Sequence, residues 1–154
     1  MHFECKVPFM SIVSQSKYKL ILLTHYSTSS HTMDKNQIHF RAEFIIDEGK
    51  IEEYKKLIQE MSRMVEANEP STIGYQFYLN KDETKCIVHE TYANSEAVLS
   101  HSNGIASQTI LPKIFSVAKI SRFDVYGNPG EKIQKLLLAR FGAQTFNLFA
   151  GFSR

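Results

Sequence analysis

The chain has 154 residues, of which 43% are hydrophobic and 22% charged, and its formal net charge is +2. This length is enough for one domain with a buried core, and the composition is ordinary for a globular protein. The small net charge argues against a nucleic-acid partner. The apolar run at residues 18–23 is far shorter than the roughly 20 residues that a membrane-spanning helix needs. We therefore expect neither a nucleic acid nor a membrane as a partner.

Residues 1–36 differ from the rest of the chain. Residues 1–32 contain three Lys and one Glu, whereas the remaining residues balance 15 basic against 15 acidic side chains. The polar run Ser27–Thr32 is typical of a linker, and Met33 directly precedes the first clear strand pattern. We expect 1–36 to be a poorly ordered N-terminal extension, with Met33 as a candidate true start. The alternative is an arm that adds an edge strand through Lys17–Thr24.

The predicted elements run in the order strand, long helix, strand, strand, helix, strand. Period-two alternation of apolar side chains predicts strands at residues 38–46, 74–79, 86–92 and 119–126. In the last of these, we expect Phe123 and Val125 to face one way and Ile120 the other, with Arg122, Asp124 and Tyr126. Apolar residues spaced three and four apart predict a helix over 50–68; they are Ile51, Tyr54, Leu57, Ile58, Met61, Met64 and Val65.

Two shorter helical segments follow the second hairpin strand. Asn94 is a good cap for a helix that ends at Asn103-Gly104. A second segment from Ile105 to Ala118 should be broken at Pro112. The whole order is that of an α+β, ferredoxin-like split βαβ fold, an antiparallel sheet with its helices on one face.

Residues 128–154 exceed this minimal domain. Asn128 is a candidate cap, Pro129 suits the first helical position, and Gly142 is a candidate C-terminal cap. We expect a helix and an aromatic tail that docks on the domain, on a partner or over a pocket mouth. Large apolar side chains in a tail are rarely left in water; they are Phe146, Leu148, Phe149 and Phe152.

The two cysteines, Cys5 and Cys86, have no metal-binding spacing. Cys86 lies within a predicted strand, so we interpret it as a buried free thiol. We predict no disulfide, which suits a reducing cytoplasm.

One stretch resembles a known family. The run His89-Glu90-Thr91-Tyr92, then Asn94-Ser95-Glu96-Ala97, then His101, is similar to the antibiotic biosynthesis monooxygenase (ABM) domain family, which includes quinol monooxygenases. The resemblance covers about Gln37 to Tyr126 and implies an ABM-like domain at 37–127. It also implies a homodimeric α+β barrel with two sheets packed face to face. Such a partner would cover the apolar groups expected on the outer sheet face, which are Ile45, Tyr78, Ile87 and Ile120.

The chain has no Gly-rich phosphate loop, HExxH or GxSxG motif. Relatives in the family oxidise phenolic or quinol-like aromatics without metal or flavin, in a pocket between sheet and helices. Such a pocket excludes water, binds a ring and holds a base near a hydroxyl. His101 matches a recurring family His and is our candidate catalytic base. His89 is the second candidate, expected to face the partner sheet. The candidate substrate-binding residues are Tyr75, Phe77, Tyr92 and Phe115.

A haem-degrading subset of the family uses a Trp, an Asn and a ligating His. This chain has no Trp, and alignment places the Trp position at His101 and the His position at Leu111. We therefore expect no cofactor and no metal. The predicted function is that of a cytoplasmic, cofactor-independent monooxygenase acting on a small aromatic compound. The alternatives are a non-oxidative isomerase of small carbonyl compounds and a small-molecule-binding dimer without turnover.

Overall fold

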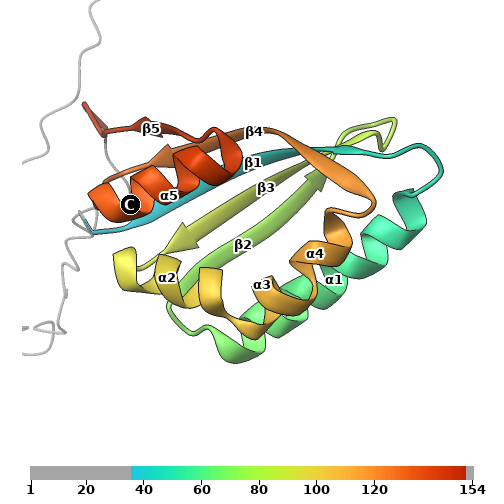
Figure 1. The fold of residues 1–154 in the computed structure, drawn as a ribbon, viewed down its shortest axis with the longest axis horizontal. Coiled ribbons are helices and arrows are strands. Elements are labelled where there is room, and N and C mark those ends of the chain that lie inside the picture. Colours follow the sequence, from blue (N-terminus) through green and yellow to red (C-terminus); the bar gives the residue numbers. More distant parts are fainter. Residues whose placement is uncertain (1–35, 152–154) are drawn as a thin grey trace, which may run out of the picture. The chain divides into compact units, whose positions relative to one another are not determined.

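A computed structural model describes residues 36–151, so the expectations for the N-terminal extension, Cys5 and Phe152 lie outside the described residues. The described chain forms one sheet with helices on one of its faces (Figure 1). The elements are β1 (Ile38–Ile46), α1 (Ile51–Asn68), β2 (Thr72–Leu79), β3 (Lys85–Tyr92), α2 (Ser95–Asn103), α3 (Ile105–Thr109), α4 (Leu111–Ile114), β4 (Ala118–Tyr126), α5 (Glu131–Phe141) and β5 (Gln144–Phe146).

The strand order in the sheet is β2-β3-β1-β4-β5. β1 pairs antiparallel with β3 on one side and β4 on the other, and β2 pairs antiparallel with β3. This is the predicted α+β, ferredoxin-like arrangement. β5 is an addition, a short strand parallel to the end of β4.

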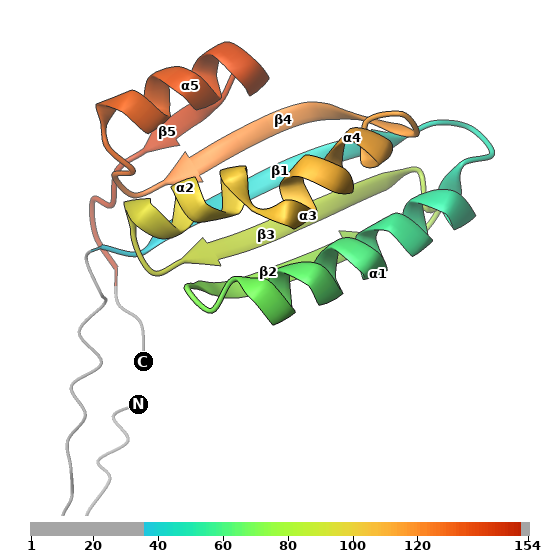
Figure 2. The same ribbon diagram turned by 60° about the horizontal axis from the view of Figure 1, so that its bottom comes forward.

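The core lies between the sheet and its helices. Helices α1 to α4 lie across one face of the sheet (Figure 2). α5 packs on the same face, where Phe141 stacks on Phe123 of β4 with ring centroids 5.1 Å apart. β1 sends alternate apolar side chains into this core, as predicted from its period-two pattern; they are Ile38, Phe40, Ala42, Phe44 and Ile46.

The helix breaks follow the capping and proline signals in the sequence. The Asn94 side chain accepts a hydrogen bond from the Ala97 N–H at 2.9 Å and begins α2, which confirms the predicted cap. α3 ends at Thr109, and α4 restarts at Leu111 with Pro112 in its first turn. A proline is tolerated there because the first helical N–H groups have no intrahelical partner.

The predicted orientation of Ile120 is wrong. Glu43 pairs with Arg122 but Phe44 pairs with Ile120, so one extra residue, Ser121, lies in β4 opposite this step. A bulge of this kind shifts the alternation of side chains by one position. Ile120 therefore faces the helices together with Phe123, and only the later part of β4 has the expected alternation.

The predicted start of the C-terminal helix is also wrong, by two residues. α5 begins at Glu131, after Gly130, whose φ of +88° lies outside helical conformation. The Asn128 side chain accepts from the Gly130 N–H at 3.0 Å and so stabilises the turn before the helix rather than its first turn. The C-terminal end agrees with the sequence, because Gly142 takes the left-handed conformation with φ of +64°.

The sheet face opposite the helices is open in the single chain. It carries exposed apolar side chains beside a charged network, in which Asp124 accepts from Arg122 at 2.8 Å. The exposed apolar residues on this face include Ile45, Tyr78, Tyr126 and Phe146. Leu148 and Phe149 of the tail are exposed as well. Within residues 36–151, no helix is long and apolar enough to cross a membrane.

Candidate active site

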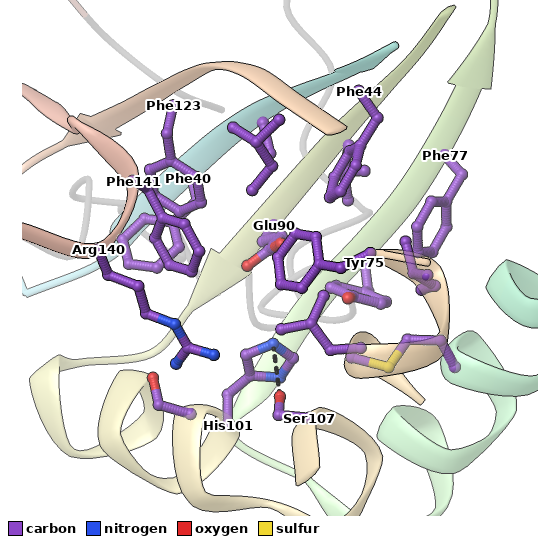
Figure 3. Close-up of a pocket in the computed structure, with 18 of the residues that line it drawn as sticks. Phe40, Phe44, Tyr75, Phe77, Glu90, His101, Ser107, Phe123, Arg140 and Phe141 are labelled. Carbon is purple, nitrogen blue, oxygen red and sulfur yellow. Dashed lines mark hydrogen bonds between the residues drawn. The ribbon is translucent and has the colours of Figure 1, made fainter. Parts of the chain in front are cut away.

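A cavity lies between the sheet and the helices (Figure 3). The cavity has a volume of about 60 Å³. Aromatic and aliphatic side chains form most of its wall, and Glu90 and His101 bring acid–base groups to it. The aromatic residues that line it are Phe40, Phe44, Tyr54, Tyr75, Phe77, Phe115, Phe123 and Phe141.

His101 is held in place by α2 and two tyrosine rings. It lies in the last turns of α2 and is only 8% exposed. The ring centroids of Tyr75 and Tyr92 are 5.5 and 5.4 Å from that of the imidazole. Figure 3 shows the imidazole pointing from α2 toward Glu90 and Tyr75. Its Nε2 atom is 3.4 Å from the Ser107 hydroxyl oxygen.

Glu69 is the partner of His101 on the other ring nitrogen. The His101 Nδ1 atom lies 2.7 Å from Glu69 Oε2, and the Thr72 hydroxyl donates to the same oxygen at 3.0 Å. Burial disfavours a charged imidazole, but the hydrogen bond to Glu69 and the negative charges of Glu90 and Glu69 outweigh it and raise the pKa of His101 above 6.5. Burial likewise opposes ionisation of Glu69, yet its bond to His101 lowers the pKa of that carboxyl.

Gly104 leaves room for this carboxylate. A Cβ atom at position 104 would lie 2.7 Å from Glu69 Oε1 and 3.1 Å from the Ser100 carbonyl oxygen. Real Cβ atoms essentially never make a contact as short as 2.7 Å. The Glu69 carboxylate could not move aside easily, because hydrogen bonds from His101 and Thr72 fix it. The absence of a side chain after α2 thus allows Glu69 to reach His101.

Glu90 projects from β3 into the cavity. It is 8% exposed and accepts a hydrogen bond from the Tyr92 hydroxyl. Burial raises the pKa of the Glu90 carboxyl, which favours its protonated form. Burial also raises the pKa of Tyr75 and of Tyr92 well above 10, so both phenols are neutral at physiological pH.

The arrangement is suited to proton transfer. A carboxylate that accepts from Nδ1–H leaves Nε2 as the acceptor, in the manner of a carboxylate–histidine dyad. Glu90 places a carboxyl group on the same cavity, and its pKa is raised by burial whereas that of Glu69 is lowered. Within residues 36–151, no group of three or more His, Cys, Asp or Glu side chains is arranged to hold a metal ion.

The structure gathers most of the residues singled out from the sequence. His101, Tyr75, Phe77 and Phe115 line the cavity. Tyr92 is fully buried behind this wall, with its ring against Phe40 and its hydroxyl on Glu90.

His89 lies elsewhere. It is exposed on the open face of the sheet, with its ring 5.4 Å from that of Tyr78. This is the face on which a partner sheet was expected.

Sequence reasoning missed both carboxylates. Glu90 was detectable, because it occupies an even position on the buried face of its strand with Val88 and Tyr92. No local sequence pattern identifies Glu69. It is the C-terminal cap residue of α1 and forms a hydrogen bond with His101, which lies 32 residues later in the chain.

Comparisons with known proteins agree on the fold. No curated protein matches the chain. The solved structure of MupZ from Pseudomonas fluorescens is 28% identical, with a TM-score of 0.65, and the match covers 77% of this chain and 95% of that one. An Asn-to-Ala mutant of SnoaB, a cofactor-independent oxygenase from Streptomyces nogalater, is 8% identical with a TM-score of 0.53, over 62% of this chain and 96% of that one.

A conserved protein from Methanosarcina mazei Go1 has a TM-score of 0.54 at 14% identity, over 62% of this chain and 95% of that one. At such identities the last two structures show the fold alone. The family model for antibiotic biosynthesis monooxygenase matches residues 38–111, from the first strand to the start of α4. The stretch that carries the sequence resemblance lies inside this range. Residues 38–111 of this chain are therefore an antibiotic biosynthesis monooxygenase domain.

Proposed function

We propose that the protein is a cofactor-independent monooxygenase of a small aromatic hydroxyl compound, with His101 as the base. The observation that carries this proposal is the His101–Glu69 pair, which reaches an aromatic-lined cavity in a domain of this family. Tyr75 and Tyr92 are poor bases because their phenols stay protonated. An imidazole has an ordinary pKa of about 6.5, close to neutral pH, which makes His101 the candidate base on this cavity.

The chemistry needs only a proton acceptor and a dry pocket. Removal of a phenolic proton by His101 Nε2 gives an electron-rich anion that reduces O₂ directly. For benzene-1,4-diol, one oxygen atom would enter the ring to give 2-hydroxy-1,4-benzoquinone, and the other would leave as water. The substrate supplies all four electrons that reduce O₂. His101 gives the proton that it accepted to the oxygen atom that leaves as water. The aromatic wall excludes bulk water from the anion.

The open sheet face supports a homodimer as the functional unit. Tyr78 is 54% exposed and Ile45 36% exposed on a face without a helix layer. A second copy that packs its sheet on this one would bury those side chains, as in the α+β barrel that the family resemblance implies. The buried free thiol of Cys86 is compatible with a reducing compartment, and we propose the cytoplasm.

One observation favours a second candidate function. Glu90 and His101 border the same cavity; burial raises the pKa of the Glu90 carboxyl, and the hydrogen bond to Glu69 raises the pKa of His101. An acid and a base on one cavity could move a proton between two carbons of a small carbonyl compound, as an isomerase does. That reaction would exchange substrate hydrogen with solvent but consume no oxygen.

Oxygen uptake separates the two candidates. The full chain is mixed anaerobically with a panel of benzene- and naphthalene-diols and then exposed to ¹⁸O₂ in an oxygen electrode. We expect stoichiometric O₂ consumption above the autoxidation rate and one ¹⁸O atom in the product. Solvent deuterium entering a carbonyl substrate without O₂ consumption would instead establish the isomerase and refute the monooxygenase.

A further inference from the structure

A basic side chain stands at the edge of the cavity. Arg140 belongs to the last turn of α5 and lines the cavity wall. Figure 3 shows its guanidinium extending from α5 toward the His101 end of the cavity. Its Cζ atom lies 5.0 Å from the centroid of the Phe141 ring. None of the ion pairs found within residues 36–151 involves Arg140.

An open hollow adjoins the cavity at this point. The hollow has a volume of about 490 Å³. It lies between the start of β4 and the end of α5. It shares four lining residues with the cavity and adds Lys119 as a second basic side chain. The residues lining the hollow include no acid; they are Phe115, Ala118, Lys119, Ile120, Arg140 and Phe141.

The sizes of the two spaces indicate how a ligand would occupy them. The inner cavity of about 60 Å³ is smaller than an apolar cavity of about 150 Å³ that accepts benzene. A whole aromatic molecule therefore does not fit in the inner cavity as it stands. Cavity and hollow together reach the roughly 300–1,000 Å³ of ordinary ligand sites. One end of the ligand would enter toward Glu90 and His101, and the remainder would lie in the hollow.

We propose that the hollow binds the anionic end of the substrate, and that the substrate is an aromatic carboxylate. The planar fork of Arg140 matches a carboxylate in two parallel hydrogen bonds, and Lys119 adds a second positive charge on the same space. Within the described part of the chain, no acidic side chain lines the hollow, so the charged groups that the carboxylate meets there are positive. Binding of the carboxylate does not depend on the proposed function. Only the reaction at the part of the ring near His101 rests on it.

Neither the family match nor a purely structural role predicts this selectivity. Arg140 lies beyond residues 38–111, so the family assigns it nothing. A cation in the last turn of a helix also complements the helix dipole. That role would stabilise α5 but would not distinguish a charged ligand from a neutral one.

Calorimetric binding to the full chain tests the proposal with 2-naphthoate and 2-naphthamide, which share one ring system and differ in charge. We expect 2-naphthoate to bind roughly tenfold more tightly, as for one partly exposed charge-assisted contact. Arg140→Gln should reduce the preference severalfold, leaving only the contribution of Lys119, and added NaCl should weaken binding of the carboxylate alone. Arg63→Gln is the matched control, because Arg63 is an exposed residue of α1 with the same charge; it should keep the preference.

Equal affinity for the two probes, an unchanged preference in Arg140→Gln, or no binding of either probe would overturn the proposal. Neither probe carries a hydroxyl group, so the result does not depend on oxygen chemistry. Charge-selective binding by a protein that consumes no O₂ would refute the monooxygenase alone. Oxygen uptake with a neutral diol, without charge-selective binding, would refute the anion site alone.

Discussion

The imidazole of His101 is joined through Nδ1 to the carboxylate of Glu69 at 2.7 Å, across 32 residues of chain. The bond links the end of α1 to the end of α2, and both side chains are buried. It raises the pKa of the imidazole and lowers that of the carboxyl. The pair therefore affects both stability and proton transfer, and the two effects can be measured separately.

Glu69→Gln should lower the pKa of His101. The amide can still occupy the site, but it removes the negative charge that offsets the cost of burying an imidazolium. The pKa can be followed by NMR of the His101 Cε1–H signal, assigned with His101→Gln. Glu66→Gln is the control, because Glu66 is an exposed residue of the same helix. An unchanged His101 titration in Glu69→Gln would mean that the carboxylate does not control the imidazole.

The pair should contribute most to stability between about pH 4.5 and 6.5, the ordinary pKa values of the two groups. The raised pKa of His101 gives stability that is complete below 6.5 and lost as the pH rises through the folded-state value. The lowered pKa of Glu69 gives stability that is complete above 4.5 and lost as the pH falls. Urea denaturation should show that Glu69→Gln costs more at pH 5.5 than at pH 9. A cost that grows toward pH 9 would contradict this assignment.

His101→Ala should reduce oxygen uptake with a diol by roughly 10²- to 10⁴-fold, the usual contribution of a general base. His101→Gln should be almost as slow, because an amide hydrogen-bonds but does not accept a proton at neutral pH. The rate of the parent protein should rise with pH through the raised pKa of His101.

His89→Ala is the control for this prediction, because His89 is exposed on the opposite face of the sheet. His101→Ala also leaves Glu69 without its main partner, so about 1–3 kcal/mol of stability should be lost. Rates are therefore compared at a temperature where both variants are folded. Normal turnover in His101→Ala beside an inactive His89→Ala would place the site on the open face.

Glu90→Gln should increase the free energy of unfolding at neutral pH. Burial raises the pKa of this carboxyl, so the folded state disfavours its ionisation, and that penalty appears as the pH rises above 4.5. A glutamine can still accept from the Tyr92 hydroxyl. We expect a gain at pH 8 and none at pH 4, measured by urea denaturation. A large loss at pH 8 would show that the ionised carboxylate stabilises the site instead.

Ile87→Asp should disrupt the proposed dimer. Ile87 lies on the open sheet face, beside Tyr78 on the neighbouring strand. A carboxylate buried there without a partner would cost several kcal/mol, giving a monomer or an unfolded chain. Ile105→Asp is the control, since Ile105 is 58% exposed on α3, away from that face. Light scattering at micromolar concentration should give twice the chain mass for the parent and the control; a monomeric parent would refute the dimer.

The order of elements could be predicted from the sequence because period and capping are local properties. The alternation in β1 and the three-and-four spacing in α1 each depend on near neighbours. The start of α5 was misplaced because Asn128 caps a turn at Gly130, and a positive φ there delays the helix.

The site was predictable only in part. The family resemblance pointed to His101, and the aromatic residues of β2 followed from strand alternation. The carboxylate that sets the protonation of His101 depends on a contact between two helix ends, which no local pattern encodes. Arg140 carries no local signal either, because its place at the cavity depends on how α5 packs.

The bulge at Ser121 has a consequence for how this sheet can change. Residues before and after it keep apolar side chains on the helix side, although they are an odd number of positions apart. If Ser121 entered the regular pairing instead of forming the bulge, Ile120 would turn outward and Lys119 would turn toward the helix side. Deletion of Ser121 would remove the bulge and leave Ile120 facing the helices, because Ile120 would then follow the alternation set by Arg122 and Phe123. If a related chain that lacks the residue at position 121 is aligned here without a gap, its β4 residues before the bulge are assigned to the wrong face of the sheet.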